Sequence, residues 1–333
     1  MTIPSGHPAI PQPKVGVLLI NLGTPDAPDT RSVRRYLAEF LADRRVVEIS
    51  PLLWQPILRG VILPTRPRKS AHAYRQIWMP EGSPLAVHTR ATAEALQQRM
   101  GGRVLVDWAM RYGNPAIGSR LAAMKAQGCE RILLAPLYPQ YSAATTATAL
   151  DAAFAAMAAM RWQPAIRTLP PYHDDPAYIA ALKASVERHL AALDFAPEAL
   201  LASFHGMPER TLRLGDPYHC QAIKTARLLG EALGRPVRIS FQSRFGRARW
   251  LEPETEATLI QMVREGVRDI AVLTPGFSAD CLETLEEIAL RAKAVFLREG
   301  GGKFAFLPCL NASPEAITLY ESLIGRELSG WGE

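Results

Sequence analysis

The feature that most constrains the fold of this chain is a regular alternation of short apolar runs with longer amphipathic stretches. Six runs rich in Val, Ile and Leu are bounded by Gly, Pro or polar residues, and they cover residues 15–21, 104–109, 131–135, 199–204, 237–241 and 270–273. Continuous apolar runs of this length indicate parallel strands that are covered on both faces.

The stretches between these runs carry apolar residues at helical spacing. They predict helices over residues 31–41, 87–100, 117–127, 145–160, 176–193, 218–233, 253–265 and 282–298. Strands that alternate with helices predict an α/β fold with mainly parallel sheets flanked by helices. Ligands of such folds bind in crevices beyond the carboxyl ends of the strands.

A chain of 333 residues suits two compact domains. The segment that starts at Val104 resembles the one that starts at Val237, and residues 141–143 fall opposite residues 277–279. Two similar α/β halves that face a central cleft would explain this repeat.

Prolines cluster between Trp162 and Tyr172, which predicts a boundary there. We expect an N-terminal domain over residues 1–165 and a C-terminal domain over residues 166–310. A C-terminal helix within residues 311–333 would pack back on the first domain.

The charge balance favours anionic partners. The 38 Lys and Arg residues exceed the 32 Asp and Glu residues, giving a net charge of +6. This suits carboxylated small molecules or phospholipid head groups. The basic residues are scattered and no basic helix is interleaved with aromatics, which argues against nucleic acid.

The four cysteines form no CxxC pair, which excludes a zinc ribbon or a thioredoxin-type motif. So few cysteines in so long a chain suit a reducing compartment. Residues 1–14 contain no apolar run of the kind that secretory signals need. We therefore expect a cytoplasmic location.

His205 is the first candidate for chemistry. An apolar strand runs directly into it, and Gly206 and Pro208 then force a turn. A neutral imidazole at a strand end can bind a divalent metal or accept a proton. The alternative is a structural histidine that caps a loop. The Gly-Asp-Pro-Tyr sequence that starts at Gly215 predicts only an ordinary turn into a helix.

Asp280, Glu283 and Glu287 form an acidic row at spacings i, i+3 and i+7, which places them on one helix face. A solvated first turn, stabilised by the helix dipole, would also explain them. A row of carboxylates leading into a cleft could instead pass protons or escort a cation. Together, His205 and Glu283 would offer ligands that suit Fe²⁺ and bases for departing protons.

Aromatic and basic residues near strand ends are candidates for the walls of a binding pocket. Tyr112 and Trp250 could stack on a planar ligand, and Arg111, Arg66 and Lys69 could bind its carboxylates. Each of these residues could equally belong to the core or the surface.

The segment from Pro51 to Leu63 is apolar and includes Trp54. It is either a buried helix or an exposed apolar lip that admits a hydrophobic ligand and contacts a membrane surface.

These segments together resemble the ferrochelatase family. The matching pieces occur in family order and span nearly the whole chain: LLINLGTP, AYRQI, MRYGNP, YPQYS, SFHGMPERTLRLGDPY, FQSRFG with WLEPET, and FSADCLETLEE. The histidine-containing piece that ends in Gly-Asp-Pro-Tyr is the most specific of them.

The resemblance implies two Rossmann-like, chelatase-type domains with a porphyrin bound in the cleft between them. It implies that His205 is the active-site histidine, which binds the metal or removes pyrrole protons, and that Glu283 is the carboxylate opposite it. Glu287 and Asp280 match an acidic row associated with metal or proton passage.

The resemblance also assigns the substrate pocket. Arg111, Tyr112 and Trp250 match pocket residues, and Arg66 looks like the basic residue near the propionates. Leu22 occupies a pocket position that is often Met or Tyr in relatives.

Two departures from the family pattern matter. Cys281 stands where many members have a histidine two residues before the key glutamate, so position 281 is not expected to be a required ligand. Some members hold an iron–sulfur cluster with C-terminal cysteines. No cysteine follows Cys309 here, so we expect no cluster and no required cofactor, with Fe²⁺ as a substrate.

The activity implied is that of a lyase that inserts Fe²⁺ into protoporphyrin IX, the last step of heme biosynthesis. The alternatives are a coproporphyrin III ferrochelatase, another tetrapyrrole metal chelatase, or a two-domain small-molecule binding protein without catalysis. The expected partners are porphyrin and ferrous iron, with peripheral membrane contact through the segment from Pro51 to Leu63, in a monomer or homodimer.

Overall fold

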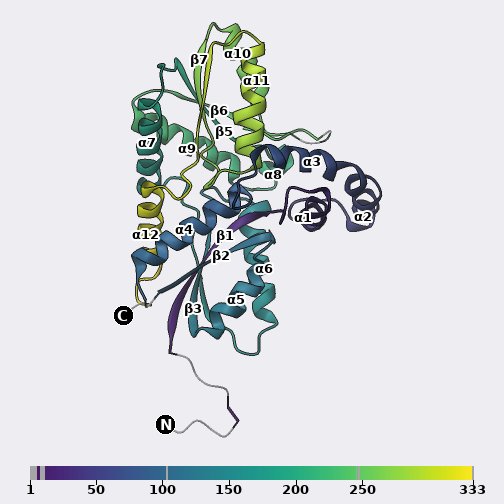
Figure 1. The fold of residues 1–333 in the computed structure, drawn as a ribbon, viewed down its shortest axis with the longest axis vertical. Coiled ribbons are helices and arrows are strands. Elements are labelled where there is room, and N and C mark those ends of the chain that lie inside the picture. Colours follow the sequence, from purple (N-terminus) through teal and green to yellow (C-terminus); the bar gives the residue numbers. More distant parts are fainter. Residues whose placement is uncertain (1–5, 8–11, 103, 245, 247, 332–333) are drawn as a thin grey trace.

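The computed structural model describes residues 6–7, 12–102, 104–244, 246 and 248–331, so the N-terminal segment lies largely outside it. The described residues form two parallel sheets of four strands each (Figure 1). The first sheet has the order β2-β1-β3-β4, with β1 (Lys14–Thr24), β2 (Val104–Gly113), β3 (Cys129–Pro136) and β4 (Ala165–Thr168). The second has the order β6-β5-β7-β8, with β5 (Ala199–His205), β6 (Val237–Gln242), β7 (Asp269–Leu273) and β8 (Lys303–Leu307).

Helices flank both sheets, which confirms the predicted α/β fold class. The first half contains α1 (Thr30–Ala42), α2 (Pro51–Ile57), η1 (Leu58–Ile62), α3 (Leu63–Ile77), α4 (Pro84–Met100), α5 (Ile117–Ala126), η2 (Ala143–Ala147) and α6 (Thr148–Ala158). The second contains α7 (Pro176–Ala191), α8 (Glu209–Arg213), α9 (Tyr218–Leu233), α10 (Thr255–Arg264), η3 (Glu283–Ala292), α11 (Lys293–Arg298) and α12 (Pro314–Glu327). The three η segments are π-helices.

Two short strands, β4 and β8, were not predicted. Each lies at one edge of its sheet, where one neighbour is enough and the apolar pattern is weak. Because β4 begins at Ala165, the predicted domain boundary falls inside the last strand of the first sheet. The first sheet therefore continues to Thr168.

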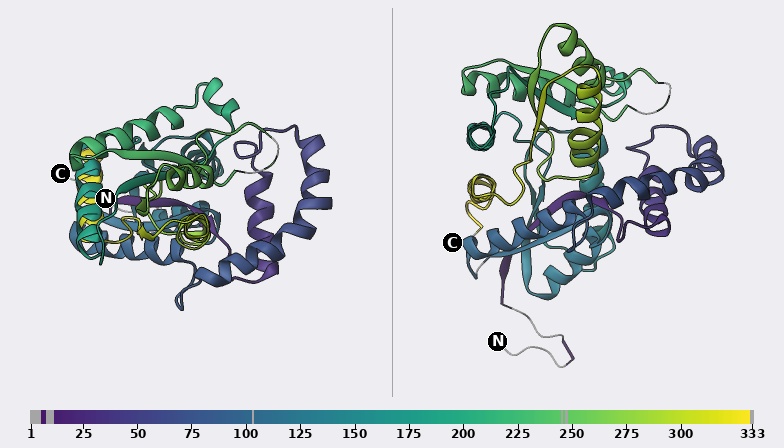
Figure 2. Two further views of the ribbon diagram at one scale, coloured as in Figure 1. Left: turned by 90° about the horizontal axis from the view of Figure 1, so that it is seen from above. Right: turned by 45° about the horizontal axis from the view of Figure 1, so that its top comes forward.

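A shared core joins the two halves. One apolar cluster contains Val17 and Leu96 from the first half, Phe204 from the second, and Ile317 and Tyr320 from α12. The helix α12 packs against α4 and α7 and lies on the same side as α7 in both views (Figure 2). An ion pair of 2.7 Å between Arg99 and Glu321 adds a polar contact between α12 and α4.

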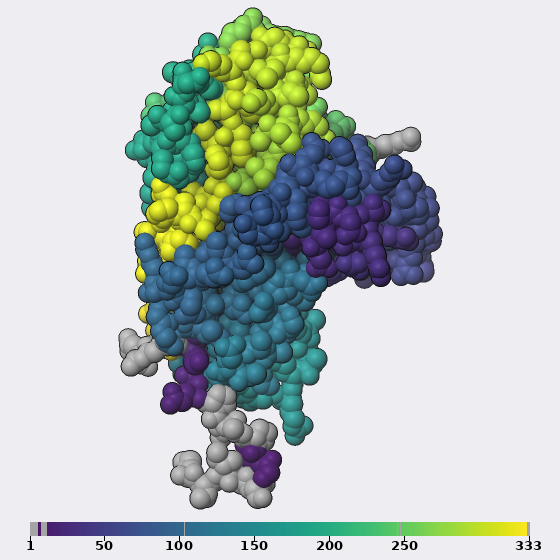
Figure 3. All heavy atoms as spheres, viewed as in Figure 1, coloured from purple at the N-terminus to yellow at the C-terminus, as the bar shows by residue number. Residues whose placement is uncertain are grey.

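The helices α1, α2, η1 and α3 (residues 30–77) project from the first half, and we call them the arm (Figure 3). Of the two interpretations of the segment from Pro51 to Leu63, the structure favours the exposed lip. Leu52 is 87% exposed and Leu53 66%, and both belong to α2. Trp54 is buried instead, and its indole nitrogen donates to the carbonyl oxygen of Leu41 across 2.6 Å.

Among the described residues, no helix combines the length and the hydropathy needed to cross a membrane.

Candidate active site

His205 is the last residue of β5 and lies in register with Gln242, the last residue of β6. The backbone amide of the following residue, Gly206, donates to the carbonyl oxygen of Gln242 across 2.7 Å. A Cβ atom at position 206 would lie 2.5 Å from that oxygen, so the turn after His205 requires glycine. The predicted strand end and turn are therefore present.

The tautomer of His205 follows from its hydrogen bond. Its Nδ1 atom lies 2.6 Å from the carbonyl oxygen of Gly206. A carbonyl oxygen can only accept, so Nδ1 carries the proton and the neutral ring has its lone pair on Nε2. Nε2 can therefore bind a metal ion or accept a proton.

Gln242 connects His205 to the acidic residues. Its Nε2 atom donates to the carbonyl oxygen of Glu283 across 2.8 Å, and its Oε1 atom accepts from the hydroxyl of Ser203 across 2.8 Å. The sequence reasoning missed this residue. Its position in the sequence could have indicated a role in the site, since Gln242 directly follows a predicted strand, just as His205 does.

Glu283 and Glu287 lie on η3, and their carboxylates interact. The hydroxyl of Ser243 donates to Glu287 across 2.6 Å, and Arg291 lies 3.3 Å from it. Burial and the negative charge of Glu283 raise the pKa of Glu287, while Ser243, Arg291 and His205 oppose that rise. Glu283, Glu287 and His205 are therefore close enough to influence one another electrostatically.

Asp280 departs from the predicted acidic row. It precedes the helix, is only 5% exposed, and receives hydrogen bonds from Asn311 (2.7 Å), Thr284 (3.0 Å) and the amide of Cys309 (3.3 Å). The prediction that it shares a helix face with Glu283 and Glu287 is therefore wrong. Its carboxylate holds the loop before η3 in place.

Cys281 is also buried, and burial raises the pKa of its thiol. A protonated thiol is a poor metal ligand. Among the described residues, no group of three or more His, Cys, Asp and Glu side chains is arranged to hold a metal ion.

The arm covers the acidic pair, because α3 packs against η3. Burial lowers the pKa of Arg66 on α3, and the charges of Glu287 and Glu283 oppose that shift. Burial raises the pKa of Tyr74, and the charge of Glu283 adds to the rise. Arg66 and Tyr74 therefore both lie within electrostatic range of Glu283, whereas Lys69 is exposed.

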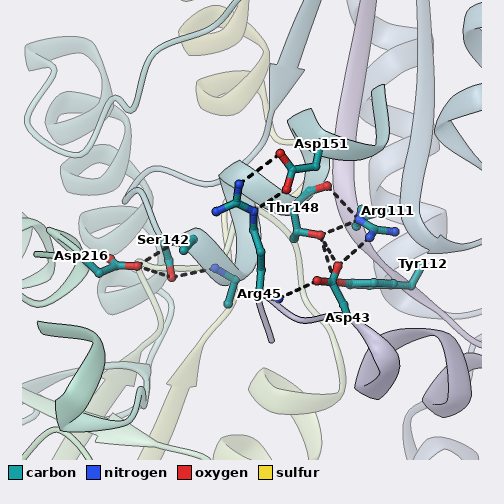
Figure 4. A network of polar contacts seen from close by, with 10 residues as sticks. Asp43, Arg45, Arg111, Tyr112, Ser142, Thr148, Asp151 and Asp216 are labelled. Carbon is teal, nitrogen blue, oxygen red and sulfur yellow. Dashed lines mark hydrogen bonds and ion pairs between the residues drawn. The ribbon is translucent and has the colours of Figure 1, made fainter. Parts of the chain in front are cut away.

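Arg111 and Tyr112 form a polar network beneath the arm (Figure 4). Arg111 Nη2 lies 2.6 Å from Asp43, and the hydroxyl of Tyr112 donates to the same carboxylate across 2.8 Å. Tyr112 is fully buried, with the Arg111 guanidinium 4.3 Å from its ring centroid. Its ring therefore offers no face to a ligand in this structure, contrary to its predicted place in the pocket wall. Leu22 packs against the same apolar cluster as Tyr112.

Trp250 packs beneath the turn that follows His205. It forms an isolated bridge with Pro208, and a Cβ atom on Gly206 would lie 3.3 Å from its ring. With Gly206, Gln242 and Arg244 it lines a pocket of about 300 Å³. Trp250 therefore supports the histidine turn from the side of this pocket.

Comparison with known proteins agrees with this geometry. A sequence model of the ferrochelatase family, described as "Ferrochelatase", matches residues 14–328. The ferrochelatase of Rhizobium meliloti (strain 1021) is 57% identical over 98% of this chain and 98% of its own length. That of Agrobacterium fabrum (strain C58) is 55% identical over 99% of this chain and 98% of its own length.

Solved structures of low identity share the fold. SirB from Bacillus subtilis with Fe³⁺ has a TM-score of 0.55 at 13% identity, covering 96% of this chain and 99% of that one. The sirohydrochlorin chelatase SirB from Bacillus subtilis subspecies spizizenii in complex with cobalt has a TM-score of 0.57 at 11% identity, covering 96% and 98%. They support the fold as two Rossmann-like, chelatase-type halves.

The match to the family runs through both sheets, the histidine turn and η3. The chain therefore belongs to the ferrochelatase family, the lyases of heme biosynthesis that insert a metal ion into a porphyrin.

Proposed function

We propose that this chain inserts Fe²⁺ into protoporphyrin IX, with His205 and Glu283 at the insertion site. The observation that carries the proposal is that His205, at the carboxyl end of β5, lies in register with Gln242, whose side-chain amide donates to the carbonyl oxygen of Glu283 across 2.8 Å. The imidazole of His205 and the carboxylate of Glu283 are each of a type that suits Fe²⁺.

Metal insertion releases two pyrrole protons, because the doubly charged cation replaces two N–H hydrogens. In our proposal, Nε2 of His205 accepts a pyrrole proton, and Glu283 and Glu287 receive the cation and take up the second proton. The raised pKa of Glu287 suits a proton acceptor, since a base works best when its pKa approaches the working pH.

The surroundings of the site support the less polar porphyrin. Protoporphyrin IX has two propionates, and Arg66 can pair with a propionate carboxylate. Coproporphyrin III has four, and its extra carboxylates suit less well a site that contains the carboxylates of Glu283 and Glu287 and, at the pocket position that the resemblance assigns, the apolar Leu22.

We further propose that the protein works in the cytoplasm and contacts a membrane peripherally, and the arm supports the membrane contact. Leu52, Leu53, Ile57 and Val61 are 87%, 66%, 44% and 56% exposed. Burial of such side chains at a lipid surface is favourable. A porphyrin dissolved in the bilayer could then reach the site directly.

The test compares Fe²⁺ insertion into protoporphyrin IX and coproporphyrin III by purified wild type, His205→Ala and Glu283→Ala. His189→Ala on α7 and Glu231→Ala on α9 are matched controls. We expect the two site variants to lose a factor of at least about 100 in kcat and the controls to stay near wild type. Undiminished insertion by both folded site variants would overturn the site, and a preference for coproporphyrin III would overturn the substrate.

A further inference from the structure

The Gly-Asp-Pro-Tyr sequence, which predicted only a turn, connects the two halves of the molecule. Asp216 of the second half accepts from the amide of Ala143 across 2.8 Å and from the hydroxyl of Ser142 across 3.1 Å (Figure 4). Its other oxygen accepts from the amide of Tyr218 across 3.0 Å. One carboxylate therefore holds the start of η2 in the first half and the start of α9 in the second.

Two neighbouring glutamines extend this contact between the halves. The side-chain oxygen of Gln221 on α9 accepts from the amide of Tyr141 across 2.6 Å. Gln140 donates to the hydroxyl of Thr225 across 3.0 Å, and both of these side chains are buried. We call Asp216, Gln221 and the residues they bind in the first half the clasp.

The clasp leads to the candidate site in the second half. Tyr218 is the second residue after Asp216, and it is buried. Burial raises the pKa of its phenol, and a hydrogen bond that the phenol oxygen accepts from the backbone of His205 opposes that rise. The residue next to the clasp thus touches the strand end that carries His205.

In the first half, the clasp leads to Arg111. Ser142 caps η2, which continues directly into α6 at Thr148. The carbonyl and hydroxyl oxygens of Thr148 accept from Nε of Arg111 across 2.9 and 2.7 Å. A continuous path of backbone and hydrogen bonds therefore runs from His205 through Asp216 to Arg111.

We propose that Asp216 is a positioning residue, which fixes the separation between the His205 side and the Arg111 side of the porphyrin cleft. This inference rests on the proposed site. Hydrogen bonds to an ionised carboxylate are short and strong, so they can fix the spacing of two rigid bodies. A planar ligand held between two walls binds well only if that spacing is set beforehand.

The test uses the whole protein and the variants Asp216→Asn and Ser142→Ala. Asn keeps the size of the side chain and one acceptor oxygen but loses the charge. The matched control is Glu321→Gln, which breaks another ion pair between the halves, with Arg99 on α4, away from the arm. Protoporphyrin binding is measured by fluorescence titration without iron, alongside KM for each substrate.

For Asp216→Asn we expect Kd and KM for the porphyrin to rise roughly tenfold, about 1.4 kcal/mol, with KM for Fe²⁺ changed less than about twofold. Ser142→Ala should shift porphyrin binding in the same direction by less, and Glu321→Gln should lower Tm without changing porphyrin binding.

Unchanged porphyrin binding in folded Asp216→Asn would overturn the inference, as would an equal effect of Glu321→Gln. Because the titration contains no iron, it measures the effect of the clasp on porphyrin binding separately from the metal-insertion reaction. Full activity of His205→Ala would instead overturn the proposed site.

Discussion

Gln242 and Glu283 are joined by a hydrogen bond of 2.8 Å from the side-chain amide of one to the carbonyl oxygen of the other. The main chain of Gln242 also pairs with His205. One residue thus sets the position of the histidine-bearing strand relative to the helix that carries the acids.

Gln242→Leu should therefore separate the two sides of the site. Loss of the amide leaves the carbonyl of Glu283 and the hydroxyl of Ser203 without these partners. We expect kcat for Fe²⁺ insertion to fall by roughly 10- to 100-fold, since small displacements of reacting groups have effects of this size. Gln261→Leu, on the surface of α10, is the control. Equal kcat values for the two variants would contradict this role.

Gly206→Ala should abolish the turn geometry after His205. The new Cβ atom would lie 2.5 Å from a backbone oxygen, which cannot move aside without displacing β6. We expect a loss of about 1–3 kcal/mol in stability and most of the insertion activity. Gly325→Ala on α12, where no atom lies within 4 Å of the Cβ position, should be neutral or stabilising. Thermal unfolding and insertion assays on both variants check this.

Glu287→Gln should stabilise the protein at neutral pH. The raised pKa of Glu287 means that the folded state favours its protonated form, so wild-type stability falls as pH rises from 4.5, the ordinary value, through the folded pKa. Gln cannot ionise, and the variant escapes this loss. We expect Tm at pH 7 to exceed that of wild type by about 2–4 °C, with the difference vanishing below about pH 4.5, while insertion activity falls. A lower Tm for Glu287→Gln than for wild type at pH 7 would contradict the predicted direction of the pKa shift.

Asp43→Asn should loosen the base of the arm. Asp43 and Arg111 are 11% and 18% exposed, and Asp43 also accepts from Tyr112 and Thr148. Burial raises the pKa of Asp43, but these hydrogen bonds and the charge of Arg111 lower it overall. Its stabilising effect is therefore present above 3.8 and is lost as pH falls through the folded pKa.

We expect Asp43→Asn to lose about 2–4 kcal/mol of unfolding free energy at pH 7, because the partly buried Arg111 loses the charge of its nearest carboxylate and keeps only Glu39 at 4.0 Å. Asp151→Asn, which breaks the exposed pair with Arg45, should lose less than about 1 kcal/mol. Chemical denaturation at pH 7 and below pH 4 checks both values. Similar losses for the two variants at pH 7 would show that the Asp43 network does not fix the arm.

Leu52→Ser with Leu53→Ser should weaken binding to lipid vesicles. The two side chains are the most exposed large apolar residues of the arm, and burying each contributes roughly 1.5–3 kcal/mol. We expect at least a tenfold loss of vesicle binding in a sedimentation assay, with insertion in detergent unchanged. Phe154→Ser, 48% exposed on α6, is the control and should bind vesicles as wild type does.

The sequence predicted those parts of the fold that depend on local pattern. The central strands and α9 follow from continuous apolar runs and helical spacing, and His205 follows from its place after such a run. The edge strand β8 was missed because its five residues, KFAFL, follow a glycine run and pair on one side only. Local pattern says little about a strand of that kind.

The site was less predictable where long-range contacts decide a side chain's position. The prediction placed Asp280 on the same helix face as Glu283 and Glu287. In the structure it precedes the helix, because the side chain of Asn311, 31 residues further along the chain, donates to its carboxylate. The prediction placed Tyr112 in the wall of the pocket. In the structure its ring is buried, because its hydroxyl donates to Asp43 and the arm packs over it. The π-helical geometry of η3 has no signature in its apolar spacing, so the sequence predicted an ordinary helix there.

The place of α12 has a consequence for folding during synthesis. The first half leaves the ribosome early, but its apolar residues Val17 on β1 and Leu96 on α4 belong to the same buried cluster as Ile317 and Tyr320 near the end of the chain. Translation adds roughly 5–20 residues per second, so the intervening residues take on the order of ten seconds to appear. The nascent first half therefore presents an uncovered apolar surface for that time.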